Sequence, residues 1–148
     1  MEDKNEFIKY KFALFGDTQV GKTAIFHKIS TGLFLDNNLS TQGTDKEVIN
    51  FTDLEIDING NKIKKSFKIT LFDMAFQERY RSITNSYIKN TDGVILIYDI
   101  TNNLSFEHVE EWLSSIKNSL SDWNKSNYLI MLLGNKLDLA SKKAVKEK

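Results

Sequence analysis

The residues with the clearest capacity for chemistry form a glycine-rich segment near the N-terminus. They match the pattern G-x-x-x-x-G-K-[ST] and are Gly16, Asp17, Thr18, Gln19, Val20, Gly21, Lys22 and Thr23. Glycines let backbone N–H groups turn inward on phosphate oxygens, where a Cβ would block the approach. Lys22 offers a cation to the outer phosphates, and the Thr23 hydroxyl is a suitable ligand for Mg²⁺. The segment therefore predicts a nucleotide phosphate site, which we call the phosphate loop.

A second motif lies far downstream and has the pattern N-K-x-D, formed by Asn135, Lys136, Leu137 and Asp138. A carboxylate on a rigid turn can accept two parallel hydrogen bonds, from the ring N–H and the exocyclic amine of guanine. Adenine does not offer that pair of donors. Alone, the pattern most often marks an exposed turn, but downstream of a phosphate loop it predicts selectivity for guanine.

The elements expected around these motifs alternate between strands and helices. Apolar-rich runs predict buried strands at residues 10–15, 93–98 and 128–133. Apolar residues at helical spacing predict helices at residues 23–29 and 106–120, and through Ile83 and Tyr87. The helix at 106–120 is expected to begin at Asn103 or Ser105 as its cap.

One pair of strands is predicted to be antiparallel. Val48 to Ile58 and Ile63 to Phe72 carry strand-like apolar residues, and Asn59-Gly60 between them favours a type I′ turn. Residues 33–45 before this hairpin have no steady period and are expected to form a loop. The fold class is therefore α/β, with a mostly parallel sheet, one antiparallel edge hairpin and helices on both faces.

Composition narrows the kinds of partner. The 148 residues include 20 basic and 20 acidic side chains, so bulk attraction to nucleic acid is not expected. The chain has no cysteine, which excludes disulfides, thiolate metal sites and a prenyl or palmitoyl anchor within these residues. The N-terminus is too polar for a signal peptide, and the apolar runs are too short to span a bilayer. We expect a soluble cytoplasmic protein.

Three further segments, at residues 40–43, 77–83 and 96–101, make the chain resemble small Ras-like GTPases and the Rab family in particular. The resemblance covers residues 8–139. It implies a P-loop NTPase fold that binds GTP or GDP with Mg²⁺ and acts as a molecular switch in vesicle trafficking. It also implies exchange factors, GTPase-activating proteins and effectors as partners.

The resemblance assigns roles to individual residues. Phe34 would lie against the guanine ring, and Lys136 would pack over its other side. Thr41 would ligate Mg²⁺ in the triphosphate state, together with Thr23, and Asp73 would hold the ion through water. Gln77 stands where the family keeps the catalytic glutamine that orients the attacking water.

One departure from the family concerns hydrolysis. The family's D-T-A-G segment here consists of Asp73, Met74, Ala75 and Phe76. The family's glycine brings its backbone N–H to the γ-phosphate, whereas a phenylalanine makes unusual backbone angles costly. The side chains of Thr18 and Gln19 would also crowd Gln77. We therefore expect slow or impaired GTP hydrolysis.

A second departure concerns the end of the chain. The family's last strand and helix are not visible up to Lys148, so we expect residues 1–148 to be a single small-GTPase G domain lacking both elements. A partner, a second domain or a further tail would complete that side, and a lipidated tail would bring the protein to endomembranes.

Two other interpretations remain open at this stage. A pseudo-GTPase scaffold would hold one nucleotide permanently or none, as Phe76 and the absent C-terminal elements would suggest. A P-loop ATPase or nucleotide kinase is disfavoured by the N-K-x-D motif and Thr41. His108 is expected to be solvent-facing or locally bonded, and Trp112 to be a packing or partner-facing residue, rather than ligands.

Overall fold

A five-stranded mixed sheet forms the centre of the computed structural model, which describes residues 7–34, 44–74, 86, 88–120 and 127–145. Its strands run in the order β2-β3-β1-β4-β5. Their bounds are β1 Ile8–Phe15, β2 Thr44–Ile58, β3 Asn61–Met74, β4 Gly93–Asp99 and β5 Leu129–Asn135. β2 and β3 pair antiparallel, and every other neighbouring pair is parallel. The predicted α/β fold with an antiparallel edge hairpin is confirmed.

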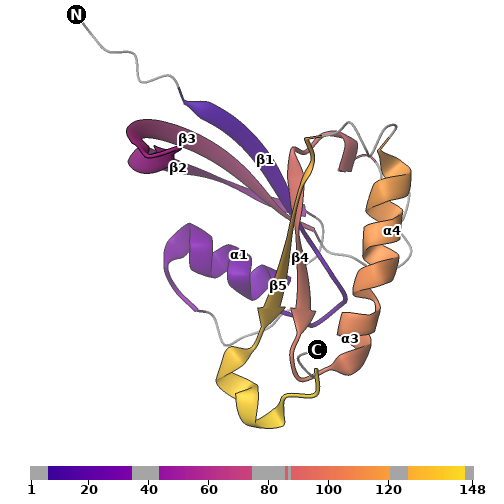
Figure 1. Ribbon diagram of the computed structural model, residues 1–148. Coiled ribbons are helices and arrows are strands. Elements are labelled where there is room, and N and C mark those ends of the chain that lie inside the picture. Colours follow the sequence, from indigo (N-terminus) through magenta and orange to yellow (C-terminus); the bar gives the residue numbers. More distant parts are fainter. Residues whose placement is uncertain (1–6, 35–43, 75–85, 87, 121–126, 146–148) are drawn as a thin grey trace, which may run out of the picture.

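The helices lie on opposite faces of this sheet (Figure 1). α1, Lys22–Thr31, covers one face, and α3, Asn103–Glu107, with α4, Val109–Ser119, covers the other. Gly32 ends α1 in the left-handed conformation, with its N–H bonded to the carbonyl of Lys28. Helices on both faces bury most of β4 and the second half of β1, residues 13–15, which explains why these stretches are apolar without alternation. The first half of β1 is more exposed and alternates with Lys9 and Lys11.

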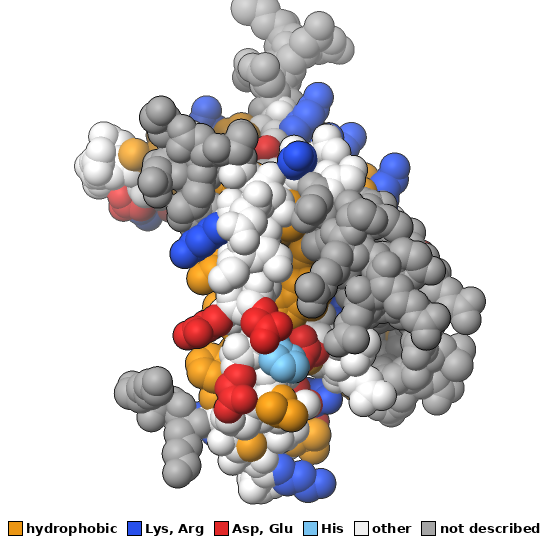
Figure 2. Space-filling model, turned by 90° about the vertical axis from the view of Figure 1, so that its right-hand side faces the viewer, with side chains coloured by type: hydrophobic (Ala, Val, Ile, Leu, Met, Phe, Trp, Pro, Cys, Tyr) orange, Lys and Arg blue, Asp and Glu red, His pale blue; other side chains and the backbone are white. Residues whose placement is uncertain are grey.

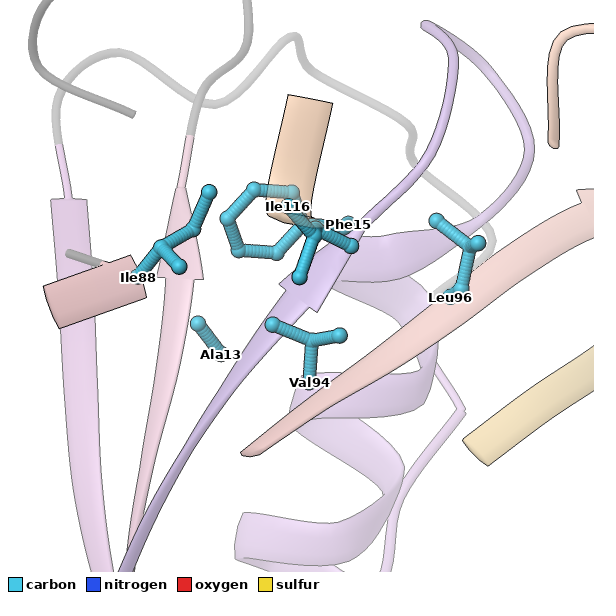
Figure 3. Packing of buried hydrophobic residues seen from close by; sticks show 6 residues of the cluster. All are labelled: Ala13, Phe15, Ile88, Val94, Leu96 and Ile116. Atoms are coloured by element: carbon cyan, nitrogen blue, oxygen red, sulfur yellow. The ribbon is translucent and has the colours of Figure 1, made fainter. Parts of the chain in front are cut away.

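Two apolar clusters hold the layers together, one on each face. On the α1 face, the cluster comprises Leu14, Val20, Phe26, Leu71 and Ile97. On the α4 face, Figure 3 shows the buried side chains Ala13, Phe15, Ile88, Val94, Leu96 and Ile116. Adjacent residues of β1 thus contribute their side chains to clusters on opposite faces of the sheet. This packing fixes the end of β1, from which the phosphate loop departs.

The β2–β3 hairpin turns at Asn59-Gly60, as predicted, with φ of 54° and 82° at these residues. A bulge between Phe51 and Leu54 interrupts its register. β2 begins at Thr44, so the last two residues of the loop expected at 33–45 belong to the strand, and residues 35–43 lie outside the described part of the chain.

Three sequence predictions about these elements are wrong. β5 was expected to be buried, but it is the edge strand of the described sheet, and several of its side chains are about half exposed: Leu129 50%, Met131 56% and Leu132 49%. The helix expected at 106–120 is two helices that meet at His108. Its first cap is Asn102, whose side chain accepts a hydrogen bond from the Leu104 N–H, and neither Asn103 nor Ser105.

The helix expected through Ile83 and Tyr87 can be followed only in part. Ser86, Ile88 and Lys89 are helical, and Ile88 is fully buried. Ile83 and Tyr87 lie outside the described residues.

Candidate functional site

The phosphate loop connects the end of β1 to the start of α1. The first N–H groups of a helix have no acceptor within the helix, so the start of a helix is suited to bind an anion. The loop's two glycines stand where no side chain fits. A Cβ on Gly16 would lie 2.1 Å from the carbonyl oxygen of Ile97. A Cβ on Gly21 would lie 2.2 Å from Nδ2 of Asn135, and φ of 99° places this residue in the left-handed region. The backbone of Ile97 therefore demands glycine at position 16. At position 21 the left-handed conformation demands it, because the Asn135 amide is a side-chain end that can shift.

Lys22 folds back over the loop that precedes it. Its ammonium group donates to the carbonyl oxygens of Gly16 at 2.8 Å and Asp17 at 2.6 Å. Burial lowers the pKa of Lys22 to about 8, although the carboxylates of Asp73 and Asp17 act in the opposite direction. A buried cation at the mouth of a loop of N–H groups is a suitable counter-charge for phosphate.

Two oxygen groups of the kind that bind hard cations lie beside this cation. Asp73, near the end of β3, is fully buried, and its side chain is hydrogen-bonded to that of Thr23. Burial raises the pKa of Asp73, against the hydrogen bond from Thr23 and the charge of Lys22. A carboxylate and a hydroxyl in contact match the oxygen ligands that Mg²⁺ prefers.

The N-K-x-D motif reaches the phosphate loop directly. Asn135 ends β5, and its Nδ2 donates to the carbonyl oxygen of Val20 at 2.8 Å. The two motifs are 115 residues apart in sequence, yet this bond joins them. It places the turn after β5 next to the loop between β1 and α1, at the carboxyl ends of neighbouring strands, where open α/β sheets bind ligands.

Lys136 and Asp99 form an ion pair next to this contact. The ammonium lies 2.6 Å from Oδ2 of Asp99, the last residue of β4, and Lys136 itself has φ of 67°. Although burial acts to raise it, hydrogen bonds from Lys136 and Thr101 hold the pKa of the Asp99 carboxyl below its usual range. The pair fixes the Lys136 side chain across the sheet edge. Sequence reasoning did not identify Asp99.

Two expected base contacts are solvent-exposed. Asp138 lies in the 3₁₀ segment Leu137–Lys142 that follows β5. Phe34, after α1, is 66% exposed. Both face solvent in the described chain, so neither is held in place by packing.

The phosphate loop also contacts His108 and Trp112, two residues that were not expected to belong to the site. The Asp17 carboxylate contacts His108 Nδ1 at 2.6 Å and accepts a hydrogen bond from Trp112 Nε1 at 2.9 Å. The two aromatic residues stand four apart at the start of α4, so they share one helix face. The spacing of His108 and Trp112 indicates that they share a helix face. It does not indicate that they contact Asp17, which lies 91 and 95 residues away in sequence.

Thr41, Gln77 and Phe76 lie outside the described residues. Within the described ranges, no group of three or more His, Asp or Glu side chains is arranged to hold a metal ion. Within the same ranges, no helix is long and apolar enough to cross a membrane.

The strand–loop–helix arrangement around the phosphate loop, in a mostly parallel sheet covered on both faces, defines a P-loop NTPase fold. The sequence profile of the Ras family matches residues 11–148 of the chain, and the chain belongs to this family. Ras-related protein Rab-19 of Xenopus laevis is 39% identical over 97% of the chain and 61% of its own length. Ras-related protein Rab-26 of Bos taurus is 36% identical over 94% of the chain and 50% of its own length.

These similarities confirm the predicted resemblance to Rab-like small GTPases. The human Rab-19 protein is 35% identical over 97% of the chain and 60% of its own length. The chain thus spans about half to three fifths of the length of these relatives.

Proposed function

We propose that residues 1–148 form a single G domain that binds GTP and GDP and acts as a molecular switch. The observation that carries the proposal is the hydrogen bond from Asn135 to the Val20 carbonyl. It holds the N-K-x-D motif against the phosphate loop, and a guanine nucleotide is a ligand that would contact both. Membership of the Ras family supports the same assignment.

Each part of the nucleotide has candidate contacts. The backbone from Gly16 to Thr23 would cradle the phosphates, and Lys22 would neutralise their charge. Asp138 would read the guanine edge, with Lys136 and Phe34 on the two sides of the ring. Because Asp138 and Phe34 are exposed in this structure, they are free to adjust to the base.

The residues present also fit Mg²⁺. The Thr23 hydroxyl and the Asp73 carboxylate are in contact beside Lys22, and Thr41 is the further ligand that the family resemblance assigns. When bound, the ion would stabilise the charge of the β- and γ-phosphates. The protein's own part is to hold these oxygens buried at the end of β3 and the start of α1.

We propose that hydrolysis is slow. Gln77 is the candidate for orienting the attacking water, but Phe76 stands where the family has glycine. A side chain at this position restricts the backbone that should meet the γ-phosphate. The proposed setting is that of Rab proteins: vesicle trafficking, in the cytoplasm and at endomembranes, with exchange factors, GTPase-activating proteins and effectors as partners.

The second candidate function is a pseudo-GTPase scaffold. Phe76 is the observation that favours it. If the segment at this position does not respond to the γ-phosphate, GDP and GTP would produce the same conformation, and exchange of one for the other would transmit no signal. Under this hypothesis the protein would hold one nucleotide, or none, and present a fixed surface to its partners.

Extraction of the bound nucleotide, followed by titration with labelled GDP and GTP with and without Mg²⁺, tests the proposal. We expect guanine nucleotides to bind in a Mg²⁺-dependent manner. Unlabelled GTP should displace the labelled nucleotide, and ATP should not. Single-turnover hydrolysis should then be faster in Phe76→Gly than in the parent chain. Absence of any nucleotide binding would favour the scaffold, and unchanged turnover in Phe76→Gly would overturn the explanation of slow hydrolysis.

A further inference from the structure

The second residue of the phosphate loop turns its side chain away from the site that would hold phosphate. The Asp17 carboxylate reaches the junction of α3 and α4, with Oδ2 2.6 Å from His108 Nδ1 and Oδ1 2.9 Å from Trp112 Nε1. Both oxygens are engaged, by groups four residues apart on one helix. This double contact holds the carboxylate in one orientation.

The contact is continuous with Lys22. The backbone carbonyl of the same Asp17 accepts a hydrogen bond from the Lys22 ammonium at 2.6 Å. A chain of contacts therefore runs from His108 through Asp17 to the cation that would meet the phosphates. Any shift of Asp17 would move a hydrogen-bond acceptor of Lys22.

The other end of the contact is anchored in the core. Trp112 packs edge-on against the buried Phe15 ring, with ring centroids 5.9 Å apart. The backbone N–H of His108 bonds to Leu104, and that of Trp112 bonds to His108. The histidine thus sits on a rigid helix junction, while its ring stays 44% exposed and open to protonation.

The surroundings of His108 are acidic on each element that faces it. Asp17 comes from the phosphate loop, Glu107 from α3 and Glu111 from α4. Figure 2 shows a histidine side chain bordered by carboxylates on this face of the molecule. The hydrogen bond and the charge of Asp17 are the two largest causes that raise the pKa of His108. Burial opposes them, and Glu111 and Glu107 add smaller effects that raise the pKa further.

Charge makes this arrangement relevant to nucleotide binding. A carboxylate in a phosphate loop repels the phosphates that the loop binds, unless a cation offsets its charge. Lys22 interacts electrostatically with Asp17 but would also have to offset the charge of the phosphates, so a second cation beside Asp17 would lower this repulsion. We propose that protonated His108 is a positioning residue, which neutralises Asp17 and holds it turned away, so that nucleotide affinity depends on pH. This inference rests on the proposed nucleotide binding.

The sign follows from linkage. Phosphates bound near Asp17 add negative charge and raise the pKa of His108 further, so binding takes up a proton. Affinity is therefore highest below the pKa of His108 in the nucleotide-free protein. It falls as pH rises through that value, up to the pKa of the bound form.

The test is titration with GDP and Mg²⁺ from about pH 6 to about pH 8.5, which brackets a raised histidine pKa. His108→Gln keeps a hydrogen-bond donor without charge, and His108→Arg keeps a permanent cation. Over this range the affinity of the parent chain for GDP should fall roughly fivefold more than that of His108→Gln. A factor of this size corresponds to the interaction energy of a partly exposed ion pair. His108→Arg should resemble the parent at the acidic end and lack this fall.

Calorimetry in two buffers of different ionisation enthalpy gives a second measurement. The parent chain should take up a proton on binding GDP near neutral pH, and His108→Gln should take up less. The same pH profile and the same proton uptake in His108→Gln as in the parent chain would overturn the inference while leaving GDP binding established. No binding by the parent chain at any pH would instead overturn the proposed function.

The ion pair itself is testable without nucleotide. An NMR titration should give His108 a raised pKa in the parent chain and a pKa near its ordinary value in Asp17→Asn. Equal values in the two proteins would contradict the coupling between His108 and Asp17, whatever the outcome of the GDP titrations.

Discussion

Gln19 holds a left-handed backbone conformation in the phosphate loop, with φ of 64°. A residue with a Cβ is strained there by about 1 kcal/mol, and glycine is not. We therefore expect Gln19→Gly to raise the free energy of unfolding by roughly 0.5 kcal/mol, after the entropy that glycine adds to the unfolded chain is subtracted. Urea denaturation in one defined nucleotide state measures the change.

Thr18 is the matched control for this substitution. It is the neighbouring exposed residue of the same loop, and its φ is not positive. Thr18→Gly should lower the free energy of unfolding by about 0.5 to 1 kcal/mol, because it only loosens the unfolded chain. Equal destabilisation by the two glycines would show that the conformation of Gln19 carries no strain.

Single residues also show how far the sequence predicts the site. The types and spacing from Gly16 to Thr23 predict the phosphate loop, because each fixed position of the motif has a local chemical reason. The contacts of Asp17 with His108 and of Asn135 with Val20 were not predicted. These contacts join segments that are brought together only by the order of strands in the sheet. A local sequence pattern does not encode that order.

Ser105 is the residue that ties α3 to the end of β4. Its Oγ accepts a hydrogen bond from the Asp99 N–H at 3.0 Å and donates one to the Asn102 carbonyl at 2.8 Å. The residue is 2% exposed, so water cannot replace a lost hydroxyl. Ser105→Ala should lower the free energy of unfolding by about 2 kcal/mol, measured by urea denaturation.

Ser30→Ala is the matched control at the same scale. The Ser30 hydroxyl donates to the Phe26 carbonyl one turn back in α1, an acceptor that the helix itself already uses. We expect a change within about 0.5 kcal/mol. If both substitutions had the same effect, the bridge between α3 and β4 would not be the reason for the loss at Ser105.

Elements were predictable where periodicity reflects burial and less so where tertiary contacts decide. Most of β4 and the second half of β1, residues 13–15, are buried as predicted, and both strands lie in the middle of the sheet. β5 has the same composition but lies at the edge of the described sheet, because an apolar run does not encode strand order. The break between α3 and α4 at His108 was also missed, since apolar spacing continues across it.

The whole molecule retains an unfavourable feature at the proposed site. Lys22 is buried, and burial dominates the lowering of its pKa, so the surroundings disfavour its charged form despite two hydrogen bonds to carbonyls. A fold selected for stability alone would place an apolar side chain there. The retained charge is consistent with a site that is completed by an anion, as stability and function commonly oppose each other at binding sites.

Lys22→Met tests this opposition. Without nucleotide, the variant should unfold with a free energy about 1 kcal/mol higher than that of the parent chain, since it buries no charge. GDP with Mg²⁺ at about a hundred times its dissociation constant should stabilise the parent chain by about 2.7 kcal/mol and the variant far less. Lys28→Met makes the same change at an exposed position of α1 and should keep the full response to GDP. A nucleotide-free Lys22→Met protein much less stable than the parent would mean that the buried ammonium supports the fold, and the buried charge would then need no ligand to explain it.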